Sequence, residues 1–222
     1  MPTYFTPDYA SFFQELDQNN HKTWFDEHRK RYEQSVRKPF LKLVADLQDA
    51  LLELDPLLDQ DPKKALFRIN RDIRFSKDKT PYHTLMKATL ARGGRKSRYA
   101  GYFLGIGANL IHVGGGLLGI EKKDLHSIRQ AIAHQPQDFQ KLIEEKRLVD
   151  TYSQLNGERN TRIPKEFQAA AEQTPFVANK QFYVMATFPV HQHLYREDLL
   201  AFLVDQAKKV TPLNRFLQQA VG

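Results

Sequence analysis

The sequence contains no cysteine among its 222 residues. This absence excludes disulfide bonds, thiolate catalysis and zinc ribbons, and it is typical of a reducing compartment. No apolar run reaches the length of a membrane span, and the first residues have neither the basic nor the apolar region of a secretion signal. We therefore expect a cytoplasmic protein with no membrane partner.

Several catalytic and metal-binding patterns are also missing. His191 and His193 form a close histidine pair without a carboxylate at ligand spacing, so we predict no metal site. Ser76 has neither a nucleophile elbow nor an obvious base, which argues against a Ser-His-Asp hydrolase. The glycine triplet 114–116 stands before a predicted helix without a Walker or dinucleotide pattern. It predicts a tight exit from a sheet more than a phosphate cradle, and the sequence predicts no cofactor.

What the sequence does contain is enough apolar material for a folded core. Hydrophobic residues make up 41% of the chain and aromatic residues 11%, which is typical of globular proteins and not of disordered ones. No internal repeat, low-complexity tract or linker divides the sequence. We therefore predict a single domain over residues 1–222.

Positive charge is concentrated in one short segment. The formal net charge is +7, but residues 1–62 carry 7 Lys and Arg against 12 Asp and Glu. Residues 63–99 carry 12 against 2, and residues 100–222 carry 14 against 12. A positive field of this kind attracts anions. The distribution predicts that the segment 63–99 binds an anionic ligand.

Within this segment, the stretch 67–76 alternates between apolar and polar residues. Successive side chains of a strand point to opposite faces, so the pattern predicts a strand with one apolar and one charged face. On this interpretation the Asp72 carboxylate lies between the Arg68 and Arg74 guanidinium groups, and one positive charge is left over. Arg71 falls on the apolar face, where it indicates a bulge, the edge of the core or a buried partner. Residues 76–81 predict a loop.

The other predicted elements make an α+β fold. The hydrophobic spacing predicts a helix from residue 8, a long helical region over 25–54 that Pro39 kinks or divides, and helices after residues 121 and 136. A last helix, from about residue 196, is predicted to break near Pro212. Alternating stretches predict strands over 84–91, 99–105, 110–113 and 181–190. We expect a mainly antiparallel sheet of about four to six strands, packed with N-terminal and C-terminal helices.

The leading hypothesis is a site for a small phosphate- or carboxylate-bearing ligand, because paired arginines make forked contacts to such groups. Phosphoester-type chemistry would need a catalytic group, although nothing in the sequence fixes a reaction. The catalytic candidates are Asp72, Asp78 and Lys79. The predicted ligand-binding residues are Arg68, Arg71, Asp72, Arg74, Ser76, Lys79 and Tyr82.

Two alternatives stay open. The first is a non-enzymatic nucleic-acid-binding module that uses the basic loop 92–98 together with Tyr82, Tyr99 and Tyr102, because bases stack on aromatic rings while cations follow phosphates. The second is a structural ion-pair motif with no ligand, since ion-pair networks often resemble binding sites.

The run Phe-Arg-Ile-Asn-Arg-Asp-Ile-Arg-Phe-Ser-Lys-Asp-Lys-Thr-Pro-Tyr at 67–82 resembles the signature of a widespread bacterial and fungal family of conserved hypothetical proteins, known as a domain of unknown function. The similarity extends to Asn19-Asn20, Trp24-Phe25, Arg29, Ile128-Arg129 and other positions over nearly the whole chain. It implies an α+β single domain and supplies no activity. The usual pattern has an aromatic residue where Asn70 stands. The family's characteristic polar positions fall on Arg68, Arg71, Asp72, Arg74, Ser76, Asp78, Lys79 and Tyr82.

Overall fold

The computed structural model describes residues 3–222. The chain forms two compact units. Unit 1 consists of the residues up to Arg95 with residues 103–113 and 187–204, and unit 2 consists of residues 96–102, 114–186 and 205–222. The single domain over residues 1–222 stays a prediction.

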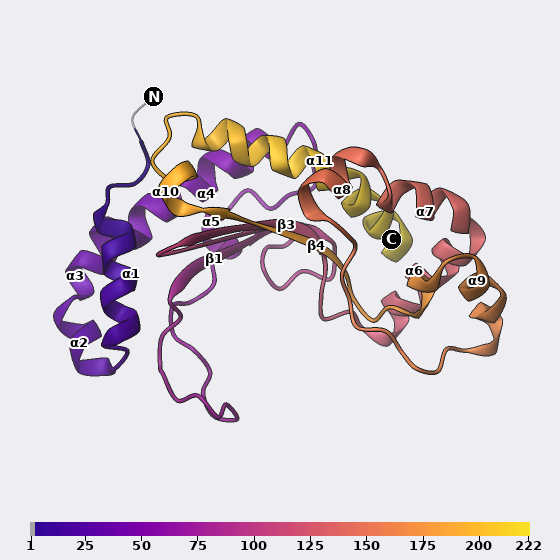
Figure 1. Ribbon diagram of the computed structural model, residues 1–222, viewed down its shortest axis with the longest axis horizontal. Helices are drawn as coiled ribbons and strands as arrows, with labels where there is room; N and C mark the ends of the chain where they lie inside the picture. The colour runs from indigo at the N-terminus through magenta and orange to yellow at the C-terminus, as the bar shows by residue number, and fades with distance from the viewer. Residues whose placement is uncertain (1–2) are drawn as a thin grey trace. The chain divides into compact units, whose positions relative to one another are not determined.

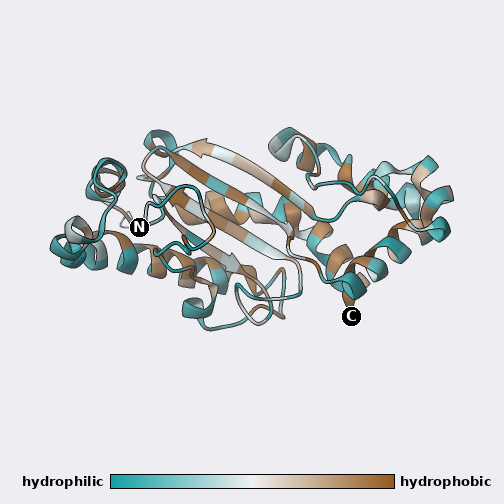
Figure 2. Cartoon of the chain, turned by 90° about the horizontal axis from the view of Figure 1, so that it is seen from below, coloured by the Kyte–Doolittle hydropathy of each residue, from teal (hydrophilic) through white to brown (hydrophobic). Residues whose placement is uncertain are grey.

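Within the described residues, four strands form one antiparallel sheet in the order β1-β2-β3-β4 (Figure 1). Figure 2 shows hydrophobic residues along these strands. Each corresponds to one of the predicted strands 84–91, 99–105, 110–113 and 181–190, so the predicted α+β class is confirmed. The strands are β1 (Leu85–Leu90), β2 (Gly101–Gly107), β3 (Leu110–Leu117) and β4 (Phe182–Pro189).

The N-terminal helices of unit 1 are α1 (Asp8–Gln18), α2 (Lys22–Glu27), α3 (Arg29–Arg31), α4 (Lys38–Leu51) and α5 (Pro62–Ala65), and α10 (Val190–His193) follows β4. A wide π-helical turn, Tyr32–Arg37, separates α3 from α4 directly before Pro39. Proline has no N–H and its ring clashes with the carbonyl four residues earlier. The division predicted at Pro39 therefore takes the form of a π turn.

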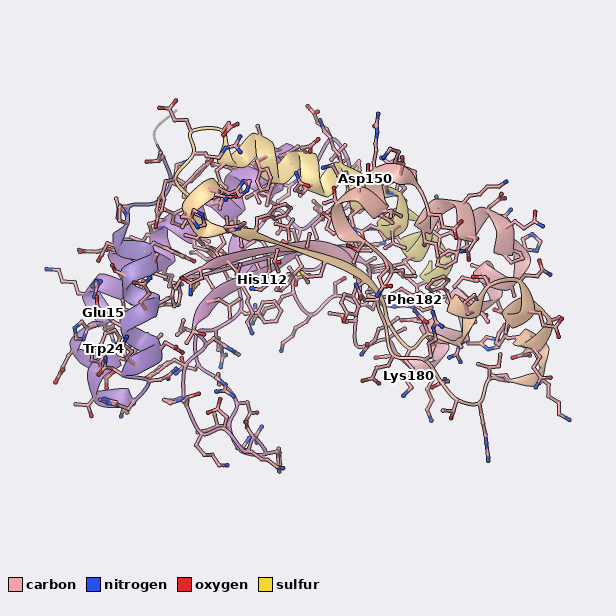
Figure 3. The ribbon with its side chains drawn as sticks, viewed as in Figure 1. Glu15, Trp24, His112, Asp150, Lys180 and Phe182 are labelled. Atoms are coloured by element: carbon pink, nitrogen blue, oxygen red, sulfur yellow. The ribbon has the colours of Figure 1, made fainter. Side chains whose placement is uncertain are left out.

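An aromatic cluster fills the core of unit 1. Phe12 of α1 packs against Trp24 of α2, with ring centroids 5.5 Å apart, and also against Phe25 and Tyr32. Figure 3 shows Trp24 on the helix next to the one that carries Glu15. The Tyr9 hydroxyl donates to the Ile106 carbonyl of β2 at 2.9 Å. These contacts attach the N-terminal helices to the sheet.

Unit 2 contains α6 (Lys122–His134), α7 (Pro136–Ile143), α8 (Lys146–Tyr152), α9 (Gln168–Gln173) and most of α11 (Leu199–Val221). The predicted break of α11 at Pro212 is wrong, because the helix continues through it. Val210 and Leu213 on either side are fully buried, and this packing offsets the lost hydrogen bond. Among residues 3–222 we find no helix with the length and hydropathy of a membrane span.

The glycine triplet 114–116 lies inside β3, and the predicted sheet exit is therefore wrong at this position. Gly116 has a φ of +120°, and a Cβ there would collide with the Phe182 carbonyl of β4. A Cβ on Gly114 would collide with the Val184 carbonyl in the same way. The glycines permit the close approach of two strand backbones.

The stretch 67–82 is the largest correction to the predicted fold, because it is not a regular strand. Isolated antiparallel bridges pair Leu66 with Ala88 and Asn70 with Tyr82, and the residues between Asn70 and Tyr82 form an irregular extended loop. We call residues 70–82 the arm. It descends from the sheet on the side opposite α4 in Figure 1.

Asn20 holds the base of the arm from the N-terminal helices. Its side-chain amide donates to the Tyr82 carbonyl at 3.0 Å, and its side-chain oxygen accepts the Tyr82 N–H at 3.1 Å. The Tyr82 ring stacks on Phe25 with centroids 4.1 Å apart. Backbone and side chain of Tyr82 are thus both fixed.

In unit 2, a buried arginine donates its hydrogen bonds to backbone carbonyl groups. Arg129 of α6 is 6% exposed and has backbone carbonyls as its hydrogen-bond acceptors. Its Nε donates to Val177 O at 2.9 Å, and its Nη2 donates to the carbonyls of Ala178 and Asn179. Burial lowers the pKa of Arg129.

We expect Arg129→Leu to lower the free energy of unfolding by about 2–4 kcal/mol, because it leaves carbonyl groups of a buried segment without a donor. The measurement is urea denaturation. Arg147→Leu removes an exposed arginine of α8 and should change stability by less than about 0.5 kcal/mol. Equal effects of the two substitutions would contradict a structural role for Arg129.

We expect Asn20→Ala to destabilise the fold by about 1–3 kcal/mol, because it removes both bonds to the Tyr82 backbone. Amide hydrogen exchange gives the local readout, and the Tyr82 N–H should exchange faster. Asn19→Ala is the matched control, since Asn19 bonds to one carbonyl of its own helix. Unchanged exchange at Tyr82 would show that Asn20 does not hold the arm.

Candidate functional site

A pocket of about 480 Å³ in unit 1 collects cationic side chains from five segments. This volume lies in the range of ligand-binding pockets. The cations come from α3, the π-helical turn, α5, the extended residues before the arm, and the loop after β1. They are Arg29, Arg37, Lys63, Arg68 and Arg95, and Glu33 is the carboxylate among the lining residues. We call this cavity the basic pocket.

The charges of the basic pocket are only partly neutralised. Glu33 pairs with Arg37 at 3.0 Å, and Asp26 outside the pocket pairs with Arg29 at 2.6 Å. In the described part of the chain, the remaining lining cations Lys63, Arg68 and Arg95 form no salt bridge. An uncompensated positive field in a concave site favours anions.

Local backbone contacts place two of these cations. The side chain of Asp61 accepts the Lys63 N–H at 2.9 Å and so caps the start of α5. The backbone N–H and the Nη1 of Arg95 both donate to the Lys64 carbonyl, at 3.0 and 3.2 Å. Gly94 makes this approach possible, because a Cβ there would lie 2.7 Å from the same oxygen. The loop after β1 is therefore tied to α5.

The remaining wall of the basic pocket is apolar. Phe25, Tyr32, Leu66, Phe67 and Met86 contribute to it. The Tyr32 hydroxyl donates to the Met86 sulfur at 3.5 Å, and burial raises the pKa of Tyr32 to about 12. The pocket thus combines cations with a hydrophobic and aromatic surface.

The structure places one residue of the predicted ligand-binding set in the basic pocket, and this residue is Arg68, together with its neighbour Asn70. The other predicted residues lie along the arm. Because the stretch 67–76 is not a regular strand, it does not align these side chains on one face. Those absent from the pocket lining are Arg71, Asp72, Arg74, Ser76, Lys79 and Tyr82.

Asp72 does not lie between Arg68 and Arg74 as predicted. Its two carboxylate oxygens accept hydrogen bonds from the Nε and Nη2 of Arg74, at 2.9 and 2.7 Å, and form a bidentate pair. The hydrogen bonds from Arg74 lower the pKa of Asp72. The pair is exposed and local, two residues apart in the sequence, and such pairs contribute little to stability.

The other catalytic candidates also have local partners in the arm. Asp78 accepts hydrogen bonds from the Thr80 backbone and from the Arg71 guanidinium, and these bonds lower the pKa of Asp78 to about 2. The Lys79 Nζ donates to the Ile73 carbonyl at 3.0 Å. An acid this strong is ionised at neutral pH, so it is suited to ion pairing and not to proton donation. For Arg71 the sequence indicated a bulge, the edge of the core or a buried partner. In the structure its guanidinium forms an ion pair with the exposed carboxylate of Asp78.

The loop 92–98 and its neighbouring tyrosines do not form a free stacking surface. Tyr82 and Tyr102 are 5% and 3% exposed. The Tyr99 hydroxyl donates to the Gly222 carbonyl at 2.9 Å, and the Arg98 Nε donates to Asp124 at 3.1 Å. These tyrosines and Arg98 therefore make contacts within the folded protein.

Four of the five cations of the basic pocket, all except Arg68, are absent from the predicted ligand-binding set. Arg29 lies in the family resemblance, which is a signal, but Arg37 reads as the polar side of a helix. Lys63 and Arg95 belong to the basic segment 63–99, although only the fold shows that they meet. Within residues 3–222, no group of three or more His, Cys, Asp or Glu residues is placed to hold a metal ion.

The comparison with protein families gives one match, to the model described as a conserved hypothetical protein (DUF2461), over residues 8–216. A search of curated proteins found no match. The match covers nearly the whole chain, and the resemblance seen in the sequence is confirmed. The chain therefore belongs to the conserved hypothetical protein family DUF2461.

Proposed function

We propose that this protein binds a small phosphate- or carboxylate-bearing ligand in the basic pocket. The observation that carries the proposal is the meeting of Lys63, Arg68 and Arg95 in one concave site of about 480 Å³, where none of the three has a carboxylate partner among residues 3–222. Arginine presents a planar set of N–H donors that matches phosphate and carboxylate oxygens.

The composition of the wall narrows the class of ligand. Several cations around one cavity match a ligand with two or more negative charges, such as a pyrophosphate or a tricarboxylate. The apolar side formed by Phe25, Tyr32 and Met86 suits a ligand that also carries a flat or hydrophobic part. A nucleotide satisfies both conditions. In the cytoplasm, where we expect the protein, phosphorylated metabolites of this kind are substrates and regulators.

The proposal is binding, without phosphoester chemistry at Asp72, Asp78 and Lys79. Asp72 and Asp78 are ionised and paired within the arm, and Lys79 bonds to a backbone carbonyl. A nucleic-acid interface at the loop 92–98 has less support, because Tyr82 and Tyr102 are buried.

The test is isothermal titration calorimetry at constant ionic strength, with pyrophosphate, citrate and ATP as separate probes. We expect at least one probe to bind, and we expect Arg68→Gln and Lys63→Gln to weaken its binding by about tenfold or more. The reason is that a hydrogen bond to a charged group contributes about 1.5–3 kcal/mol, and 1.4 kcal/mol corresponds to a factor of ten.

Arg74→Gln is the matched control, because it removes the same charge from an exposed arm residue outside the pocket. It should leave the affinity within about twofold. A loss of affinity in Arg74→Gln but not in Arg68→Gln would move the site to the arm. Absence of binding by all three probes, with tight salt-dependent binding of a mixed-sequence oligonucleotide, would favour the nucleic-acid alternative.

A further inference from the structure

A second group of basic side chains lies on the opposite side of β1 from the helices. Met86 and Ala88 are buried in the core, so the side chain of Lys87 between them points to the other face of the sheet. The cross-strand neighbour of Lys87 is Phe67, whose N–H donates to the Lys87 carbonyl at 2.9 Å. Met86 lines the basic pocket and Lys87 does not. The two groups are neighbours, because the Phe67 ring beside Lys87 also lines the basic pocket.

The contacts of Lys87 are unusual for a half-buried lysine. Its Nζ lies 3.3 Å from Nε2 and 3.4 Å from Nδ1 of His83, and 5.6 Å from the centroid of the Phe67 ring. In residues 3–222 neither Lys87 nor His83 has a carboxylate partner. The nearby Arg71 directs its guanidinium to Asp78 and Thr80. A half-buried ammonium without a counter-charge is poorly stabilised.

The electrostatic surroundings shift the protonation equilibrium of Lys87 toward the neutral amine. Burial, followed by the positive charge of Arg71, lowers the pKa of Lys87. Burial and the charges of Lys87 and Arg71 lower the pKa of His83 to about 4. The charged and titratable groups that act on Lys87 are thus His83 on its own strand segment and Arg71 of the arm, which is itself paired with Asp78. At neutral pH, His83 is uncharged and can accept a proton.

We propose that Lys87 is a nucleophilic amine that forms an imine with small aldehydes or ketones carrying an anionic group, and that His83 is its base. A lysine becomes nucleophilic when it is desolvated or lies beside another cation, and an adjacent base completes the arrangement. Lys87 is half-buried, with Arg71 as the nearby cation and His83 as the adjacent base. Arg71 is paired with Asp78, but the surrounding segment 63–99 carries 12 Lys and Arg against 2 Asp and Glu, and this excess favours a carbonyl compound with a carboxylate or phosphate.

The reaction needs no oxidant or reductant, and its reactants are the Lys87 amine and the carbonyl compound. The lone pair of the neutral Lys87 Nζ attacks the carbonyl carbon, a C–N bond forms, and the carbonyl π electrons move to oxygen. His83 takes a proton from the nitrogen and passes it to the oxygen, which gives a carbinolamine. The second nitrogen proton passes in the same way to the hydroxyl group, which leaves as water, and the imine remains. The net change is amine plus carbonyl to imine plus water.

The test is reductive trapping of the full-length protein with glyoxylate and cyanoborohydride at pH 7, followed by quantitative peptide mass spectrometry. Each lysine of the chain is then compared with the others in one sample. We expect Lys87 to be modified at least about tenfold faster than the exposed Lys30 and Lys123. Equal or slower modification of Lys87 would overturn the proposal, and this comparison needs no variant.

Three variants separate the parts of the inference. Lys87→Arg should abolish the fast modification, and His83→Asn should slow it by about tenfold or more while Lys30 and Lys123 react as before. An unchanged rate in His83→Asn would remove His83 from the mechanism. Arg147→Gln removes an exposed charge from α8 and should leave the Lys87 rate unchanged. A Lys87 rate that falls as much in Arg147→Gln as in His83→Asn would overturn the role of His83.

Discussion

The paired hydrogen bonds between Asn20 and the Tyr82 backbone fix the point at which the arm returns to the sheet. They join residues that are 62 positions apart, and the stacking of Tyr82 on Phe25 adds a second contact to the same helices. His83 follows directly, and its N–H donates to the Ile69 carbonyl at 2.8 Å. In this register Asn70 pairs with Tyr82 at the same point, and Leu66 pairs with Ala88 of β1 further along.

That register distributes one basic segment over two faces. Leu66 lies opposite Ala88, so Phe67 lies opposite Lys87, and alternation then turns Arg68 toward the helices that line the basic pocket. His83 and Lys87 point away from them. A shift by one residue would exchange these directions. The sequence shows a single concentration of positive charge, and the structure brings Arg68 to the basic pocket and Lys87 to His83.

The strands and the first helices could be predicted from the sequence, because their signals are local. Alternating residues in β1 and β4 and the helix start at Pro7-Asp8 need no knowledge of distant contacts. The stretch 67–76 shows why the same rule can fail. Up to Ile73 the side chains do alternate between more and less buried positions. Beyond Asn70, however, no strand among the described residues continues the hydrogen-bonded pairing, and Phe75 is 95% exposed. Alternation predicts which way side chains point and does not supply a partner strand.

The candidate site was harder to predict because its charges come together only in three dimensions. Arg37 and Arg95 are far apart in the sequence. Arg95 can bond to the Lys64 carbonyl because the preceding residue, Gly94, has no Cβ that would collide with the same oxygen. The carboxylates of the motif, in contrast, have partners that are close to them in the sequence. Asp72 and Asp78 each bind a cation within the arm itself. Asp72 and Asp78 thus have partners inside the arm, whereas Arg68 lies in the basic pocket and forms no salt bridge within residues 3–222.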